Sequence, residues 1–363
     1  MTTSTPTSIR KIRVLIVDDS LFMRAAIAKA LAAGPFEVVG QAKDGNDAVA
    51  QIVKLAPDVV TMDFNMPGMT GADAVRLVMQ QRPTPVVMFS AHTKQGAKET
   101  FDALAAGAVD FLPKPAGEVS VDLTKIADEL ARKLVAAAQS RPRAAAPPPA
   151  RSPGSSGSFP AMRSASSMTS LATASQPGSL PRLCVIGIST GGPAALSELV
   201  PALSPDLRIA VVVVQHMPAG FTGPFAERLD AASRIDVQEA RDGHRPMPGS
   251  VLIAPGDRHL EFDDRGVVML THGPLVNGCR PAADVTMMSA ARVYGRRALA
   301  VVMTGMGKDG AAGALAIKRA DGKTLAQDQA TSVIYGMPRA AIDAGAIDEV
   351  AALGDIPAWL RYA

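Results

Sequence analysis

Short apolar runs that alternate with helical patterns constrain the fold of this chain more than any other feature. Between residues 12 and 138, each apolar run of four to six residues is followed by a stretch with helical periodicity. Such alternation is typical of βα repeats, whose right-handed crossovers build one parallel sheet. The pattern therefore predicts a doubly wound α/β domain. Its expected strands are Ile12–Val17, Phe36–Gln41, Asp58–Met62, Pro85–Phe89 and Val109–Leu112.

A second α/β pattern begins at Arg182, after a stretch rich in Pro, Ser, Ala and Gly that has no apolar periodicity. We therefore expect a first domain over residues 10–138, a disordered linker over 139–181 and a second doubly wound, parallel-sheet domain over 182–363. The main strands of the second domain are expected at Leu183–Ile188, Ile209–Val214, Ala298–Met303 and Thr324–Gln327. A small antiparallel insertion is expected from Val251–Ala254, His259–Phe262 and Val267–Leu270.

Composition excludes several classes of protein. Only 4% of the 363 residues are aromatic, so aliphatic cores are expected. The net charge of +3 comes from residues 140–181, which hold four arginines and no acidic residue, so neither domain has the basic surface of a nucleic-acid-binding protein. The chain has no apolar run of the ~18–20 residues that span a bilayer, no signal-peptide core, and no cysteine spacing typical of disulfides or metal sites. We expect a cytoplasmic protein without membrane insertion.

Polar side chains stand at the carboxyl ends of the strands expected in the first domain. These ends converge on one crevice in a doubly wound sheet, so the side chains are expected to meet. Three clustered carboxylates suit Mg²⁺, which prefers oxygen ligands. A lysine and a hydroxyl at the same rim suit a phosphoryl group. The residues are Asp18, Asp19, Asp63, Ser90 and Lys114.

The motifs around these residues resemble those of two-component response-regulator receivers, which are flavodoxin-like. The resemblance implies that Asp63 accepts a phosphoryl group from a histidine kinase. It implies that Asp18 and Asp19 hold Mg²⁺ with Asp63, and that the backbone carbonyl of Asn65 completes the metal site. Ser90 and Lys114 would sense the phosphate, and Phe111 would be either the switch aromatic or a plain core residue. The motifs are Val17-Asp18-Asp19-Ser20, Asp63-Phe64-Asn65-Met66-Pro67-Gly68, Ser90-Ala91 and Lys114-Pro115.

The first strand of the second domain ends in a turn of small residues. Leu183–Ile188 is followed by Ser189-Thr190-Gly191-Gly192, and Pro193 suits the first position of a helix. Ser189 could be a nucleophile, the glycines could hold a phosphate, or the turn could serve packing alone. The phosphate interpretation is the weaker, because the spacing matches neither G-x-G-x-x-G nor a loop ending in Gly-Lys-Ser/Thr.

A nucleophilic serine needs a base and a carboxylate that orients the base. Of the five histidines, only His216 follows a strongly apolar strand in the same domain as Ser189. Asp309 lies in a glycine-rich loop after another such strand. These three residues are therefore the predicted triad, and backbone N–H groups of Thr190 or Met306 are candidates for the oxyanion hole. Rival carboxylates follow weaker strands or turns and are Asp242, Asp257, Asp284 and Asp328.

Four motifs in order make the second domain resemble the catalytic domain of the chemotaxis protein-glutamate methylesterases, and the order receiver, linker, esterase matches too. The resemblance implies a Rossmann-like domain that hydrolyses glutamate γ-methyl esters of chemoreceptors, releases methanol and deamidates receptor glutamines during adaptation. The motifs are Ser189-Thr190-Gly191-Gly192-Pro193, Gln215-His216-Met217-Pro218, Ala254-Pro255-Gly256-Asp257 and Thr304-Gly305-Met306-Gly307-Lys308-Asp309-Gly310.

The resemblance further implies a Ser-His-Asp acyl-enzyme mechanism without a cofactor in the esterase domain. An unphosphorylated receiver would cover Ser189, and phosphorylation of Asp63 would release it. We expect a monomer whose partners are chemoreceptors and the histidine kinase of their pathway. One alternative, a receiver joined to a non-catalytic interaction module, is opposed by the presence of all three triad residues. Another, a DNA-binding response regulator, is opposed by the near-zero charge of both domains and by the lack of a helix-turn-helix pattern.

Overall fold

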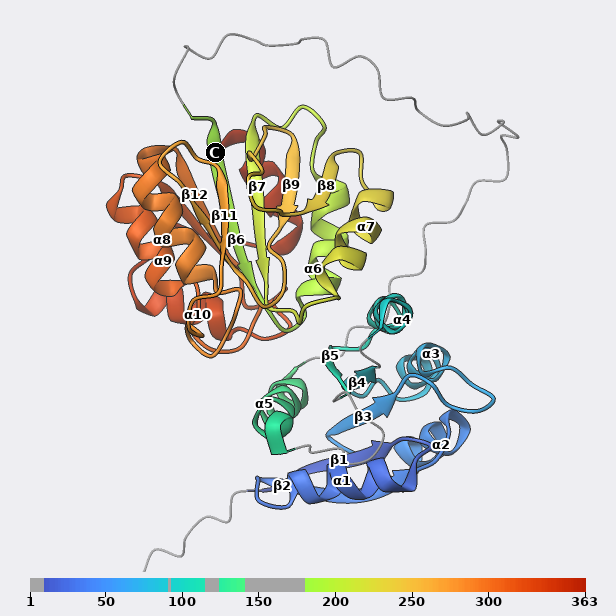
Figure 1. The fold of residues 1–363 in the computed structure, drawn as a ribbon. Helices are drawn as coiled ribbons and strands as arrows, with labels where there is room; N and C mark the ends of the chain where they lie inside the picture. Colours follow the sequence, from blue (N-terminus) through green and yellow to red (C-terminus); the bar gives the residue numbers. More distant parts are fainter. Residues whose placement is uncertain (1–9, 91–92, 115–123, 141–179) are drawn as a thin grey trace, which may run out of the picture.

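The computed structural model describes residues 10–90, 93–114, 124–140 and 180–363 (Figure 1). The described residues form two separate parallel sheets, each covered by helices, and one small antiparallel sheet. The predicted linker over 139–181 lies outside the described residues except at its two ends. Within the described ranges, no helix is both long enough and apolar enough to cross a membrane.

The first sheet has five parallel strands in the order β2-β1-β3-β4-β5. This is the flavodoxin-like order of a doubly wound sheet, as predicted. Helices α1 and α5 pack on one face, and α2, α3 and α4 pack on the other. The strands are β1 (Ile12–Val17), β2 (Phe36–Ala42), β3 (Val59–Asp63), β4 (Val86–Ser90) and β5 (Asp110–Pro113). The helices are α1 (Leu21–Leu31), α2 (Gly45–Leu55), α3 (Gly71–Gln81), α4 (Lys94–Ala105) and α5 (Thr124–Gln139).

Side-chain caps start the first four helices just beyond the strand ends. Ser20, Asp44, Thr70 and Thr93 each accept a hydrogen bond from a backbone N–H of the first turn. Such caps satisfy a donor that the helix itself leaves unpaired. Strand, loop and helix start are thereby held together, which fixes the loops that carry the functional side chains.

The second sheet has seven parallel strands in the order β14-β13-β12-β6-β7-β9-β8. From β6 the chain first adds strands on one side and then returns to add β12, β13 and β14 on the other. The carboxyl end of β6 is therefore the switch point, where open α/β sheets form a crevice. The strands are β6 (Arg182–Ile188), β7 (Ile209–Gln215), β8 (Asp236–Glu239), β9 (Ser250–Ile253), β12 (Ala298–Val302), β13 (Lys323–Gln327) and β14 (Glu349–Ala351).

Helices and short 3₁₀ segments cover this second sheet. The α-helices are α6 (Gly192–Leu199), α7 (Thr222–Ala232), α8 (Ala283–Tyr294), α9 (Ala311–Arg319), α10 (Gly336–Asp343) and α11 (Ile356–Tyr362). The 3₁₀ segments are η1 (Val200–Ala202), η2 (Gly295–Arg297) and η3 (Leu353–Asp355). Two doubly wound parallel sheets, the second Rossmann-like, are thus confirmed.

The small antiparallel insertion is confirmed as a hairpin of β10 (His259–Phe262) and β11 (Val268–Thr271). The assignment of Val251–Ala254 to it was wrong, because β9 pairs in parallel with β7 and β8 inside the main sheet. The physical reason lies in burial. Residues 251–253 are all buried, which suits a strand covered on both faces better than a hairpin with one face in water.

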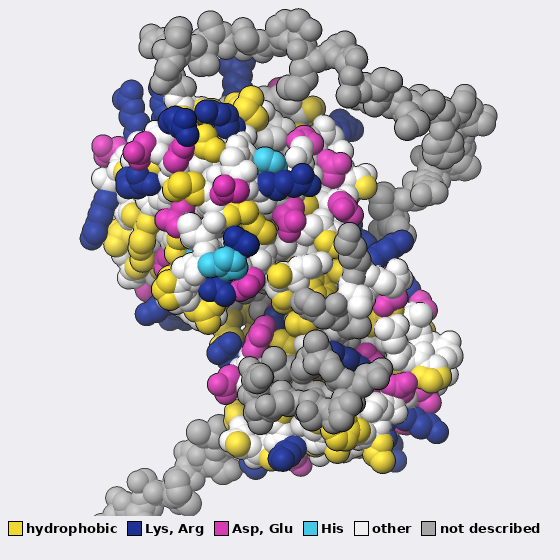
Figure 2. All heavy atoms as spheres, viewed as in Figure 1, with side chains coloured by type: hydrophobic (Ala, Val, Ile, Leu, Met, Phe, Trp, Pro, Cys, Tyr) yellow, Lys and Arg dark blue, Asp and Glu magenta, His cyan; other side chains and the backbone are white. Residues whose placement is uncertain are grey.

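The two halves pack against each other through aromatic side chains. Phe101 of α4 stacks on Phe225 of α7 with ring centroids 5.0 Å apart, and Phe111 of β5 meets Phe221 at 4.7 Å. One cluster of buried apolar residues runs across both halves. Figure 1 shows the α4 and β5 side of the first sheet nearest to the end of the second sheet at which β6 and β7 finish. On the face shown in Figure 2, acidic and basic side chains are interspersed.

Candidate active site

The first crevice gathers three carboxylates and a lysine at the carboxyl ends of β1, β3 and β5. The Lys114 ammonium lies 3.0 Å from Asp18 Oδ2 and 2.9 Å from Asp63 Oδ2. Asp18 and Asp63 are buried, whereas Asp19 is exposed. One carboxylate oxygen from each of the three aspartates lies within 4.8 Å of the others. This set of oxygen donors fits a hard divalent cation such as Mg²⁺.

Burial and charge act on the groups of this crevice in opposite directions. Burial outweighs the neighbouring lysine and raises the pKa of Asp63 from 3.8 to about 6. Burial also opposes the charge of Lys114, but the two carboxylates outweigh it and raise the pKa of that ammonium. The lysine therefore stays charged and faces the carboxylate that is expected to carry a phosphoryl group.

The remaining residues predicted for this crevice are placed differently. Ser90 ends β4 beside the crevice, and its hydroxyl donates to the carbonyl of Gly96 at 2.9 Å. Asn65 is exposed on the loop after β3. Phe111 is buried at the contact between the two halves, 4.7 Å from the ring of Phe221. Phe111 therefore packs against the second half as well as in the core of the first.

A second crevice opens at the carboxyl end of β6. Ser189 directly follows this strand, its N–H donates to the carbonyl of Thr304 at 2.9 Å, and its own carbonyl accepts from Gly192 at 2.8 Å. Gly191 has a positive φ of 79°, and a Cβ there would lie 2.6 Å from Cβ of Val333. Only glycine fits this tight turn without strain, and the turn leaves Ser189 half-buried at the edge of the sheet.

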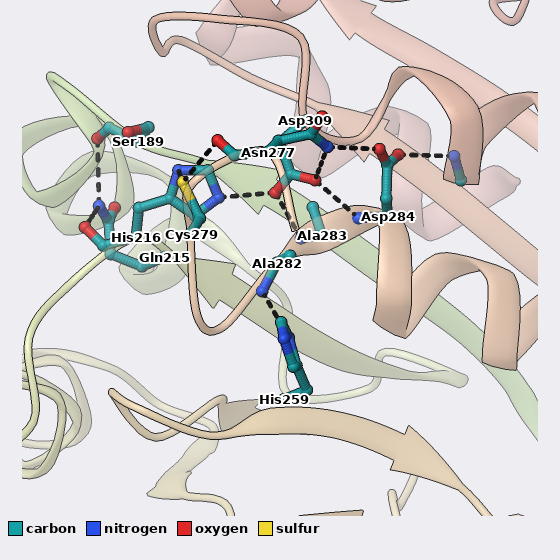
Figure 3. A network of polar contacts seen from close by, with 11 residues as sticks. Ser189, Gln215, His216, His259, Asn277, Cys279, Ala282, Ala283, Asp284 and Asp309 are labelled. Atoms are coloured by element: carbon teal, nitrogen blue, oxygen red, sulfur yellow. Dashed lines mark hydrogen bonds and ion pairs between the residues drawn. The ribbon is translucent and has the colours of Figure 1, made fainter. Parts of the chain in front are cut away.

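His216 and Asp309 meet beside this turn. His216 follows β7, Asp309 lies in the loop between β12 and α9, and the Nε2–Oδ2 distance is 2.7 Å. Asp309 is buried and also accepts from the N–H groups of Ala283 at 2.6 Å and Asp284 at 3.1 Å, at the start of α8. Figure 3 shows Asp309 on the side of the imidazole that faces away from Ser189.

These contacts shift the pKa values of His216 and Asp309. Burial opposes the charge of the imidazole, but the hydrogen bonds to Asp309 and Cys279 outweigh it and raise the pKa of His216. Burial likewise opposes the charge of Asp309, and its contact with His216 and the backbone N–H groups lowers the pKa of that carboxyl. Each of the two groups therefore stabilises the charged form of the other.

The hydroxyl of Ser189 makes no hydrogen bond to any of the described residues. The other ring nitrogen of His216, Nδ1, is instead 3.5 Å from Sγ of Cys279. The side-chain amide of Gln215 donates to the carbonyls of both Ser189 and His216 at 3.1 Å, so it joins the two loops through their backbones. The structure thus brings the three predicted residues to one edge, with the histidine paired to the aspartate.

The candidates for the oxyanion hole differ in their surroundings. Thr190 is buried, and its hydroxyl donates to Oδ2 of Asp110 in the first half at 2.8 Å. Met306 is 38% exposed. Neither backbone N–H has a partner among the described residues. Both N–H groups therefore stay candidates for the oxyanion hole, although the side chain of Thr190 is engaged by the first half.

The rival residues have other partners. His259 is buried and bonds to the carbonyl of Pro274, 2.9 Å from Nε2. Asp257 pairs with Arg280, and Asp328 accepts from Thr331. Asp284 lies next to Asp309 but has no contact with His216. None of the rivals reaches the histidine in the part of the chain described.

Three residues near the triad were missed from the sequence: Gln215, Asn277 and Cys279. Asn277 donates its amide to Asp309 Oδ1 at 3.0 Å and to Asp284 Oδ2 at 2.8 Å. A signal was present for two of them, because Asn277-Gly278 between Val276 and Cys279 is a strong hairpin-turn sequence. That signal predicts the turn but not its contact with the triad.

Comparison with known proteins places this chain among its relatives. The CheB methylesterase family model matches residues 184–360, and the response regulator receiver domain model matches residues 14–125. A protein named protein-glutamate methylesterase/protein-glutamine glutaminase from Pyrococcus abyssi is 43% identical over 97% of this chain and 93% of its own length. A protein of the same name from Symbiobacterium thermophilum is 46% identical over 94% of each chain.

A solved structure adds to these relatives. The crystal structure of the Thermotoga maritima CheB methylesterase catalytic domain shares 43% sequence identity, covers 50% of this chain and 98% of its own, and has a TM-score of 0.49. The identity of the full-length relatives extends over both halves of this chain and over nearly all of their own length. The chain belongs to the protein-glutamate methylesterase/protein-glutamine glutaminase family, in which a response regulator receiver domain is joined to a CheB methylesterase domain.

Proposed function

We propose that this chain is a chemotaxis esterase that is activated by phosphorylation. It hydrolyses the γ-methyl esters of glutamate in chemoreceptors, releases methanol and deamidates receptor glutamines. The observation that carries the proposal is the 2.7 Å contact between His216 Nε2 and the buried Asp309, at the same sheet edge as Ser189. A base held in this way beside a serine at a strand–helix turn suits acyl transfer.

The chemistry proceeds in two acyl-transfer steps. Ser189 Oγ attacks the ester carbonyl carbon while neutral His216 takes the hydroxyl proton, and the same proton leaves with methanol as the carbon–oxygen bond breaks. Water then attacks the acyl-serine and gives a proton to His216, which returns it to Ser189 Oγ as the bond between Oγ and the acyl carbon breaks and the glutamate carboxyl is released. In deamidation, ammonia leaves in place of methanol. Backbone N–H groups of Thr190 and Met306 would stabilise the oxyanion.

The contact with Asp309 indicates which ring nitrogen of His216 would serve as base. Nε2 of His216 is bonded to Asp309, so Nδ1 is the nitrogen that can take a proton from Ser189. In the structure Nδ1 lies beside Cys279, and the hydroxyl of Ser189 is not bonded to it. A movement of serine or imidazole that brings the hydroxyl to Nδ1 would therefore precede attack.

The receiver would control access to this crevice. Asp110 accepts from the hydroxyl of Thr190, the residue next to the nucleophile, and Phe111 packs on Phe221. A receiver held there would cover the turn that carries Ser189 and limit the access of a receptor to it. We infer that phosphorylation of Asp63 shifts the population away from this closed state.

Phosphorylation needs the first crevice. Asp18, Asp19 and Asp63 would hold Mg²⁺ with the backbone carbonyl of Asn65, and the ion would neutralise charge on the incoming phosphoryl group. Lys114 already contacts Asp63, and Ser90 stands at the end of the next strand, so both could contact the phosphate. The phosphodonor would be the histidine kinase of a chemotaxis pathway.

The organisation that goes with this function is also a proposal. We propose a receiver domain over residues 10–138, a linker over 139–181 and a catalytic domain over 182–363. The protein would act as a cytoplasmic monomer on the cytoplasmic part of its receptors.

Methanol release from a methylated chemoreceptor fragment tests the proposal. The full chain is compared with Ser189→Ala and Asp63→Asn, each with and without acetyl phosphate and Mg²⁺. We expect release by the unchanged protein that rises with phosphodonor, none by Ser189→Ala, and a low, unstimulated rate for Asp63→Asn. Methanol release by Ser189→Ala at the unchanged rate would refute the assigned nucleophile, and full stimulation of Asp63→Asn would refute the phosphorylation site.

A further inference from the structure

A tight turn in the loop before α8 reaches into the proposed triad. Val276 and Cys279 exchange two backbone hydrogen bonds, of 3.1 and 2.9 Å, and form an isolated antiparallel bridge. The two residues between them, Asn277 and Gly278, have positive φ angles of 52° and 77°. This is the geometry of a type I′ turn, for which Asn-Gly is the preferred sequence.

Both polar side chains of this turn, Asn277 and Cys279, touch the triad. The amide nitrogen of Asn277 lies between two buried carboxylates, 3.0 Å from Asp309 Oδ1 and 2.8 Å from Asp284 Oδ2. Cys279 places Sγ 3.5 Å from Nδ1 of His216. Figure 3 shows the turn reaching His216 and Asp309 from the same side.

The turn itself is held in place by a buried residue of β10. His259 contacts the carbonyl of Pro274 at 2.9 Å through Nε2 and accepts from the N–H of Ala282 at 3.3 Å through Nδ1. The Arg280 guanidinium adds a hydrogen bond to the carbonyl of Gly273 at 2.7 Å. The segment that carries the turn is thus fixed at both ends, so the position of Asn277 is determined by the scaffold.

We propose that the Val276–Cys279 turn is a positioning element of the triad and that Asn277 is the residue through which it chiefly acts. The inference rests on the proposed function, because it takes Ser189, His216 and Asp309 as the triad. Asn277 does not touch the substrate or the reacting atoms. It acts through Asp309, which in turn orients the imidazole.

The physical need for this amide comes from the two carboxylates. Asp284 and Asp309 are 5% and 2% exposed, and Asp309 is among the groups that raise the pKa of Asp284. Two buried carboxylates repel each other unless donors lie between them. Both carboxylates accept hydrogen bonds from backbone N–H groups, and the bond from Gly313 to Asp284 is 2.7 Å long. Asn277 is the side-chain donor that the two carboxylates share. Without it, Asp309 would rotate away from its neighbour or take up a proton, and either change would release the imidazole.

Two substitutions separate this role from a purely structural one. Gly-Gly and Asp-Gly are also favoured in type I′ turns, so Asn277→Gly and Asn277→Asp should both keep the turn. Asn277→Gly removes the donor. Asn277→Asp replaces the donor with an acceptor and adds a third carboxylate to the pair. A structural role predicts similar activity for all three proteins, whereas a positioning role predicts the order Asn, then Gly, then Asp.

The experiment uses the full chain with acetyl phosphate, Mg²⁺ and a methylated chemoreceptor fragment, and it measures kcat, KM and the pH profile. For Asn277→Gly we expect kcat to fall about 10- to 100-fold with KM unchanged, as for the loss of one hydrogen bond to a charged group. For Asn277→Asp we expect a larger fall. The side chains that face His216 are those of Asp309 and Cys279, with Asp284 behind them. A further carboxylate should therefore move the acid limb of kcat to higher pH. Cys279→Ala removes only the weaker contact and should change kcat less than Asn277→Gly.

Several outcomes would overturn the inference. One is equal kcat in the three proteins; another is an effect confined to KM. A third is a loss that is fully explained by a smaller folded fraction, measured by circular dichroism under assay conditions. The failure of the proposed function is distinct, because an unchanged rate for Ser189→Ala would remove the triad itself, whereas normal activity of Asn277→Gly beside an inactive Ser189→Ala would remove only the positioning role.

Discussion

The contact between Asp110 and Thr190 gives the sharpest test of the proposal that the receiver holds the esterase closed. Asp110 Oδ2 accepts from the Thr190 hydroxyl at 2.8 Å, and both side chains are buried. On the receiver side, Oδ1 of Asp110 accepts from the ammonium of Lys133 at 2.8 Å and from the N–H of Phe111 at 2.7 Å. Replacing Asp110 with alanine removes the only acceptor that the described receiver residues offer to Thr190. Lys133 keeps Glu129 as a neighbour at 4.0 Å.

The size of the effect follows from the kind of hydrogen bond that is lost. A hydrogen bond to a charged group contributes about 1.5–3 kcal/mol, and about 1.4 kcal/mol is a tenfold change in an equilibrium constant. The closed state of Asp110→Ala should therefore lose about 10- to 100-fold in population relative to the open state. If access to Ser189 limits the unphosphorylated enzyme, methanol release without phosphodonor should rise by up to the same factor.

A second contact between the two halves provides the matched control. Arg228 and Asp102 also pair across the boundary, at 2.8 Å, but their side chains are 37% and 44% exposed. Such exposed pairs contribute about 0–1 kcal/mol. Asp102→Ala should therefore raise the basal rate by no more than a few-fold. The assay is methanol release from a methylated receptor fragment in EDTA, which prevents phosphorylation, with circular dichroism to show that each variant is folded.

Two results would refute the reasoning. If folded Asp110→Ala keeps the basal rate of the unchanged protein, the buried contact does not hold the closed state. If Asp102→Ala raises the basal rate as strongly as Asp110→Ala does, then the loss of any contact between the two halves activates the enzyme. The burial of the Asp110 carboxylate would then not explain the effect.

Three further predictions follow from the same geometry. Above pH 6 in EDTA, Asp63→Asn should raise the free energy of unfolding by at most about 3 kcal/mol, because a carboxyl whose pKa is raised from 3.8 to about 6 costs stability when it ionises. This gain in stability should vanish below about pH 4, where the carboxyl is protonated in both states. Chemical unfolding of both proteins above pH 6 and below pH 4 checks this. Removal of Mg²⁺ with EDTA should abolish stimulation by acetyl phosphate but leave the basal rate of methanol release, and stimulation that survives EDTA would contradict the metal site. Gly191→Ala should destabilise the protein and abolish methanol release, since its Cβ would lie 2.6 Å from that of Val333. Gly243 is the control, because it has a similar φ of 84° and open space around it. Gly243→Ala should cost only the conformational strain of about 1–2 kcal/mol, measured by a thermal melt.

The strand-end residues could be predicted from the sequence because topology determines where they lie. Once parallel strands alternate with helices, every residue that directly follows a strand comes to one edge of the sheet. Asp63 ends β3 and Lys114 follows β5, and they meet at 2.9 Å although they are far apart in sequence. His216 also directly follows a strand, and it meets Asp309 of the loop after β12 at the corresponding edge of the second sheet, at 2.7 Å.

Residues on loops and between the halves could not be predicted in this way. Asn277 reaches Asp309 only because the turn that carries it is held by His259, and no periodicity encodes that path. Thr190 and Asp110 are 80 residues apart in different sheets, and their contact depends on how the halves dock. The run at 251–253 was assigned to the wrong sheet because a short apolar run fits a buried parallel strand and a hairpin equally well.

One strand links the two crevices, and this suggests how a phosphoryl group on Asp63 could act at Ser189. Lys114, which contacts Asp63, directly follows β5, and its backbone N–H is bonded to the carbonyl of Ser90 at 2.7 Å. Asp110 and Phe111 begin the same four-residue strand and make the contacts with the second half. A displacement of Lys114 and Ser90 would therefore move the ends of β4 and β5 together. Because the interface residues lie on β5 itself rather than on a loop, a shift or twist of that strand would reach them without any intermediate element. We expect the coupling to depend more on the stiffness of β5 than on the linker.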